Sequence, residues 1–99
     1  MVKIDKKTQI TILLSERIDA MNSDETLESI LDTLKTIDED LIFDVTKLDY
    51  ISSAGLQVVL KCAQLAQENG RDTFLKGARG TIKEIFQVSG FLTFIKELK

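Results

Sequence analysis

Histidine is absent from the 99-residue sequence, and cysteine occurs once, at Cys62. Without histidine the chain lacks the commonest general base, the usual partner of a nucleophilic serine or cysteine, and the commonest metal ligand. A single cysteine permits neither an intramolecular disulfide nor a thiolate zinc site within the chain. We therefore expect a protein of a reducing compartment that is not an enzyme and that holds no metal ion.

Basic charge is not in excess, and no apolar run is long enough for a membrane. The sequence has 13 Lys and Arg against 16 Asp and Glu, a formal net charge of -3, whereas proteins that track a phosphate backbone usually carry a basic footprint. The longest apolar runs, such as residues 12–14, are far shorter than the roughly 18 residues of a membrane span. Charges interrupt residues 1–7 before a leader peptide could develop. We expect a cytoplasmic protein with no direct nucleic-acid partner and no membrane insertion.

The composition is that of one globular domain. Hydrophobic residues make up 43% and charged residues 29% of the chain, close to the usual values of about 45–50% and 25%. No proline-rich, Gly/Ser-rich or single-sign charged stretch divides the sequence, and it contains no internal repeat. We expect a single domain over residues 1–99.

Four segments have the pattern of β-strands. Residues 9–14 are rich in β-branched side chains and alternate polar with apolar, which is typical of a strand with one buried face. Residues 2–4 predict a shorter strand before it, and residues 73–75 a later one. Residues 41–43 form a continuous apolar run that ends at Asp44, which is typical of a strand covered on both faces.

Helical spacing of apolar side chains predicts three helices between these strands. The first extends over about residues 22–37, with Asn22 and Glu25 as a capping box. The second covers residues 53–69 and ends where Gly70 can adopt a left-handed conformation. A third lies around residues 82–86. The tail, residues 91–98, suits either a helix or a strand.

The alternation of strands and helices predicts an α/β domain. We expect a mainly parallel, mixed sheet of four or five strands, packed with three to four helices through right-handed connections. Binding sites in such sheets favour the loops beyond the carboxyl ends of the strands. The segment from Asp44 to Ser53 is predicted to be the loop that leaves the most buried strand, so it is the first candidate site.

Two serines, Ser52 and Ser53, stand where the second predicted helix begins. Serine is common there because its hydroxyl caps free backbone N–H groups. The alternative is that one serine accepts a phosphoryl group, because a helix start also holds a phosphate. Gly55 in the first turn costs up to about 1 kcal/mol relative to alanine, which suggests that a partner's backbone approaches closely there.

Three separated motifs support a more specific hypothesis. Residues 41–44 read Leu-Ile-Phe-Asp and residues 52–56 read Ser-Ser-Ala-Gly-Leu. In these segments the chain resembles the anti-sigma factor antagonists, small proteins of the STAS class, which have an apolar strand ending in Asp and then Asp-Ser-Ser/Thr-Gly-Leu at a helix start. Residues 14–20 are similar to that family's Leu-x-Gly-x-Leu-Asp segment, and residues 86–91 to its closing segment.

The resemblance implies a STAS-like fold and gives roles to particular residues. Ser53 matches the serine that the family's partner kinase phosphorylates, and Ser52 is the rival acceptor. Three positions depart from the family pattern: Ser52 stands where many members have Asp, Ala54 where they have Ser or Thr, and Glu16 where they have Gly. The residues expected at the partner-binding surface are Asp19, Asp44, Ser52, Ser53, Ala54, Gly55 and Leu56.

The function implied by the resemblance is a phosphorylation-controlled binding switch. The unphosphorylated protein would bind an anti-sigma factor of the histidine-kinase-like ATPase type, which is also the serine kinase, and would thereby free a sigma factor to activate transcription. A PP2C-type phosphatase would reverse the modification, and no cofactor is expected. One alternative is a STAS subunit of a lipid-transport or sensory complex that is never phosphorylated.

Two further interpretations come from individual side chains. A Ser/Lys hydrolase would use Ser53 with Lys47 or Lys61, although no nucleophile-elbow motif accompanies the serine. A carboxylate metal site would use Asp19, Asp44 and Asp49, although their spacing follows no known ligand pattern.

Overall fold

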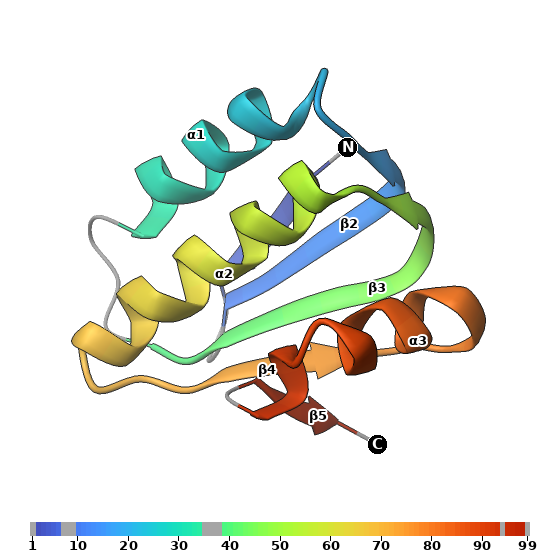
Figure 1. Ribbon diagram of the computed structural model, residues 1–99. Helices are drawn as coiled ribbons and strands as arrows, with labels where there is room; N and C mark the ends of the chain where they lie inside the picture. Colours follow the sequence, from blue (N-terminus) through green and yellow to red (C-terminus); the bar gives the residue numbers. More distant parts are fainter. Residues whose placement is uncertain (1, 7–9, 35–38, 94, 99) are drawn as a thin grey trace.

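The computed structural model describes residues 2–6, 10–34, 39–93 and 95–98, which form one five-stranded sheet with three α-helices and one short 3-10 helix (Figure 1). The elements in chain order are β1 (Val2–Lys6), β2 (Ile10–Ile18), α1 (Ser23–Leu34), β3 (Leu41–Ile51), α2 (Ser53–Glu68), β4 (Thr73–Lys76), α3 (Gly80–Val88), η1 (Phe91–Thr93) and β5 (Lys96–Leu98). The predicted α/β fold is confirmed.

The sheet is mixed, as expected. Its strand order is β1-β2-β3-β4-β5; β1 runs antiparallel to β2, and every other neighbouring pair is parallel. Because each parallel pair is joined through an α-helix, the carboxyl ends of β2, β3 and β4 point to the same edge of the sheet. The ends of β2 and β3 lie side by side at Ile18 and Ile51, whereas β4 ends earlier, with Lys76 opposite Asp44. The starts of α2 and α3 follow directly from that edge.

The helices cover one face of this sheet (Figure 1). Alternate residues of β2 and β3 point into a single core, which they share with side chains from all three helices; its largest fully buried members include Ile12, Phe43, Ile30, Val59 and Phe86. Ile42 points to the other face, where no helix of the described residues packs. It is nevertheless only 7% exposed, since Thr11 and Phe74 flank it on the neighbouring strands. The expectation of a strand buried on both faces is therefore confirmed over residues 41–43, although helices pack on only one of those faces.

β3 is much longer than the sequence predicts. The predicted loop over residues 44–53 is wrong, because the strand continues to Ile51. From Leu13 to Ser15 the chain moves two residues along β2, but the paired residue on β3 moves three residues, from Asp44 to Lys47. A second such shift follows at Glu16. Each bulge inserts one extra residue into β3, so buried residues there recur at every third position instead of every second.

Opposite these bulges, Glu16 adopts a left-handed conformation with φ of 64°. It is the one residue other than glycine with positive φ among those described. This conformation costs a residue with a Cβ roughly 1–2 kcal/mol, which glycine avoids. The departure from the family's glycine at this position therefore places strain in β2 beside the candidate site.

The helix predictions are largely confirmed. α1 begins one residue later than expected, and its predicted end at residue 37 lies outside the described residues. The predicted capping box is wrong, because the Asn22 carboxamide turns back to accept from the Asp19 N–H and to donate to the Arg17 carbonyl. α2 is followed by Gly70 at φ 73°, as expected. The tail, for which both forms were open, contains a 3-10 turn and then a strand.

Candidate functional site

The start of α2 distinguishes the two serines. Ser52 is the N-cap: its Oγ accepts a hydrogen bond from the Gly55 N–H at 3.2 Å, and its own N–H donates to the Ile18 carbonyl at 2.9 Å. Ser53 is the first helical residue, and it is exposed. The capping role predicted for one serine is thus carried by Ser52, which leaves the Ser53 hydroxyl at the surface beside the free N–H groups of the first turn.

Gly55 is buried, and the structure overturns the expectation that it faces a partner. A Cβ at this position would lie 2.7 Å from Cγ1 of Ile51, 2.9 Å from Cγ2 of Ile18 and 2.9 Å from the Ile18 carbonyl oxygen. Glycine is therefore required so that the first turn of α2 can pack on the ends of β2 and β3. Its role is internal packing.

Asp19 follows the end of β2 and borders the start of α2, because its neighbour Ile18 is hydrogen-bonded to Ser52. Its Oδ1 accepts from the backbone N–H of Met21 at 2.9 Å and of Asn22 at 3.3 Å. The hydrogen bond from the Met21 N–H is the main cause that lowers the pKa of the Asp19 carboxyl. Desolvation raises this pKa, whereas the hydrogen bond from the Asn22 N–H and the Arg17 guanidinium lower it further. The ionised carboxylate therefore fixes the turn into α1.

Arg17 and Tyr50 join this site although the motifs did not point to them. The two residues are register partners on β2 and β3. The Arg17 guanidinium lies 5.0 Å from the centroid of the Tyr50 ring, and its Nε donates to Asp19 Oδ2 at 2.9 Å. The pairing depends on both bulges, so no regular strand register could have found it.

Asp44 does not border the serines, and that expectation is corrected. It lies within β3, paired with Leu13 and Lys76, and its Oδ1 accepts from the N–H and the hydroxyl of Thr46 at 3.0 and 2.6 Å. The seven strand residues 45–51 separate it from Ser52. At about 3.3 Å per residue, these place it of the order of 20 Å along the strand.

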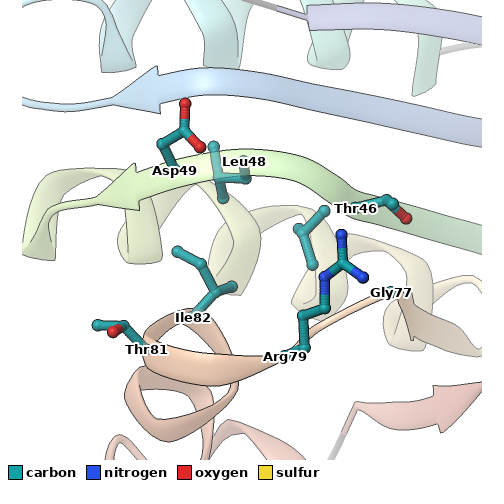
Figure 2. Close-up of a pocket in the computed structure, with 8 residues that line it drawn as sticks. Thr46, Leu48, Asp49, Gly77, Arg79, Thr81 and Ile82 are labelled. Carbon is teal, nitrogen blue, oxygen red and sulfur yellow. The ribbon is translucent and has the colours of Figure 1, made fainter.

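A cavity of about 260 Å³ lies between β3 and the start of α3 (Figure 2). Figure 2 shows Arg79 extending from the start of α3 toward Thr46 on β3. A side chain at Gly77 would collide with Thr46. The residues of β3 that line this cavity, from Val45 to Asp49, come before the end of the strand that leads to the serines.

The other predicted residues lie along α2. Ala54 is half-buried and lines a shallow groove between α1 and α2, together with Asp24 and Lys61. Leu56 is half-buried against the core. Lys61 is eight residues beyond Ser53 on the same helix, a rise of about 12 Å, so the geometry does not pair the two for catalysis.

Cys62 is buried, and desolvation raises the pKa of its thiol to about 12. Within the described part of the chain, no group of three or more acidic or cysteine side chains could hold a metal ion. The three aspartates of the metal-site interpretation do not converge, because Asp44 is remote from Asp19 along the sheet. No helix that the structure describes is long and apolar enough to cross a membrane.

A mixed sheet with helices on one face, and a serine exposed at the start of the helix after its longest strand, define a small α/β domain with the architecture of the anti-sigma factor antagonists. The family model described as STAS domain matches residues 1–99, and the chain belongs to that family. The resemblance stated from the motifs is thus confirmed.

One curated relative is BtrV of Bordetella bronchiseptica, named as an anti-sigma factor antagonist. It is 40% identical over 53 residues, which cover 54% of this chain and 46% of the relative. The matched segment therefore spans about half the length of that protein.

Solved structures of similar fold cover nearly the whole chain. Unphosphorylated SpoIIAA, an anti-sigma factor antagonist, superimposes with a TM-score of 0.85 at 17% identity, over 100% of this chain and 89% of that chain. Phosphorylated SpoIIAA from Bacillus gives 0.77 at 17% identity, over 100% and 92%. A STAS domain protein from Planctomyces limnophilus gives 0.88 at 10% identity, over 99% and 88%. At these identities the likeness concerns the fold alone.

Proposed function

We propose that this protein is an anti-sigma factor antagonist whose binding is switched by phosphorylation of Ser53. The observation that carries the proposal is that the two serines at the start of α2 differ: Ser52 caps the helix, whereas Ser53 is exposed. The unphosphorylated protein binds an anti-sigma factor and so frees a sigma factor. The carboxyl edge of the sheet forms the binding surface, with Asp19, Ser52, Ser53, Ala54 and Leu56.

The partner in this proposal is a histidine-kinase-like ATPase that is both the anti-sigma factor and the serine kinase. A PP2C-type phosphatase removes the phosphate, and the cycle takes place in the cytoplasm. In this proposal residues 1–99 act as one STAS domain. The relative named as an anti-sigma factor antagonist and the family membership support this assignment.

The switch acts at the interface and not through the fold. Phosphate at a helix N-terminus is favourable within the protein, because the first-turn N–H groups and the helix dipole stabilise negative charge. A phosphoserine adds roughly -1.5 to -2 charge, which must be desolvated against a surface that fits a hydroxyl. If that costs about 3–4 kcal/mol, the affinity falls by roughly two to three orders of magnitude.

The test is phosphorylation by the purified kinase with ATP, followed by intact-mass analysis. Wild type and the matched control Ser52→Ala should each gain one phosphate, although Ser52→Ala loses its cap and about 1 kcal/mol of stability. Ser53→Ala should gain none. Labelling that persists in Ser53→Ala but disappears in Ser52→Ala would move the acceptor by one residue. Absence of phosphate in wild type, both here and in protein from its native cells, would favour the non-phosphorylated STAS subunit.

A further inference from the structure

Two large hydrophobic side chains are exposed at the same edge of the sheet as Ser53. Met21 is 96% exposed and Tyr50 is 45% exposed; the third such side chain among the described residues is Val88, which is 88% exposed on α3. α3 leads the chain back from the carboxyl edge, so Val88 lies away from the serines. The exposed apolar surface is therefore not spread evenly over the molecule.

A chain of contacts joins Met21 to Tyr50. The Asp19 carboxylate accepts from the Met21 N–H through Oδ1 and from Arg17 Nε through Oδ2, both at 2.9 Å, and the Arg17 guanidinium stacks on Tyr50. We call Met21, Tyr50 and the Arg17–Asp19 pair between them the Met21–Tyr50 patch. It is continuous with the start of α2, because Tyr50 precedes Ser52 by two residues and Ser52 is bonded to β2.

The patch has the composition of an interface centre. Methionine, tyrosine and arginine are enriched at such centres, and tyrosine and arginine supply much of the binding energy. Because the Met21 backbone is held by Asp19 and the Tyr50 ring by Arg17, binding would chiefly have to order the side chain of Met21.

The surroundings of the patch are acidic. Residues 16–25 contain four acidic side chains, Glu16, Asp19, Asp24 and Glu25, against one basic side chain, Arg17. A complementary partner surface is therefore apolar at its centre and basic at its rim, because matched charges steer association and disfavour other partners.

We propose that the Met21–Tyr50 patch is the principal contact of this protein with its anti-sigma factor, which receives Met21 and Tyr50 in an apolar socket with a basic rim. This inference rests on the proposed function and deepens it. Phosphate on Ser53 then opposes binding at the border of the patch, where the new charge disturbs the seating of the apolar side chains in their socket.

The experiment compares Met21→Ala, Tyr50→Ala and the control Val88→Ala by calorimetry against the purified histidine-kinase-like ATPases of the same cell. Met21→Ala and Tyr50→Ala should each weaken binding at least about tenfold, while Val88→Ala changes it less than about twofold and all three melt like wild type. Tyr50→Phe, which keeps the ring, should bind like wild type. Added salt should slow association of wild type more than that of the double variant Asp24→Asn, Glu25→Gln.

Three outcomes would overturn the inference, and they are distinguishable. If wild type binds a partner and both alanine variants bind it equally well, the patch is not the contact and the proposed function stands. If wild type binds none of these ATPases, the proposed function fails and the inference fails with it. If sedimentation shows a wild-type dimer that Met21→Ala dissociates, the patch joins two copies of this chain instead.

Discussion

Replacing Gly55 by alanine tests how closely α2 is seated on the sheet. On an exposed helix the substitution would be favourable by up to about 1 kcal/mol. Here the added Cβ would lie 2.7 to 2.9 Å from Ile51 and Ile18, where ordinary contacts begin near 3.4 Å. One of the atoms in its way is the Ile18 carbonyl oxygen, which accepts the Ser52 N–H and cannot withdraw without weakening that bond.

Overpacking of this kind costs typically 1–3 kcal/mol, and a weakened backbone hydrogen bond adds about 0.5–1.5 kcal/mol. Against the helical gain, we expect Gly55→Ala to lose about 1–3 kcal/mol, which is roughly 5–20 °C in Tm for a domain of this size. Thermal and urea melts would measure it. Gln57→Ala, at an exposed position of the same helix, is the control and should change the stability by no more than about 0.5 kcal/mol. A Gly55→Ala protein as stable as wild type would refute the packing argument.

Three further substitutions or conditions test other features. Glu16→Gly should stabilise the fold by up to about 1 kcal/mol, because glycine adopts the left-handed conformation without strain. The control Lys47→Gly, at an exposed position of β3, should destabilise the fold. A loss of stability in thermal melts of Glu16→Gly would show that the Glu16 backbone is not strained. Burial and a pKa of about 12 should keep Cys62 unreactive toward iodoacetamide at pH 8 until the protein unfolds, so rapid alkylation of the native protein would show that its helix opens. The folded pKa of Asp19 lies below its ordinary value of 3.8, so the contribution of its charge to stability is present above pH 3.8 and is lost as the pH falls through the folded pKa. The difference in stability between wild type and Asp19→Asn should therefore shrink in that range. A difference that stays constant would mean that the charge of Asp19 is not involved.

Much of this fold could be predicted from hydrophobic periodicity. The stripe along residues 53–69 and the left-handed Gly70 predicted α2 almost to the residue, because amphipathic helices leave a regular pattern. The same reasoning did not predict that residues 44–51 continue β3. Two bulges change the repeat of buried residues in β3 from two to three, and nothing local marks where an inserted residue falls.

The candidate site was predicted in part for the same reason. Ser52, Ser53 and Asp19 follow the ends of their strands, and topology brings those ends together. Asp44 was assigned to that edge only because β3 was expected to stop there. The Arg17–Tyr50 contact is a product of the shifted register, and the burial of Gly55 depends on the distance between helix and sheet. Both are tertiary properties that a single sequence does not carry.

Negative charge at Ser53 should weaken docking on the anti-sigma factor while it leaves the fold intact. Calorimetry of wild type and Ser53→Asp against the anti-sigma partner, with melts of each protein alone, tests it most directly. The added charge at the start of α2 should be neutral or stabilising by at most about 0.3–1 kcal/mol, whereas binding should weaken at least about tenfold, or roughly 1.4 kcal/mol. Equal affinities would contradict the switch at the interface, and a melted variant would show that it acts through the fold.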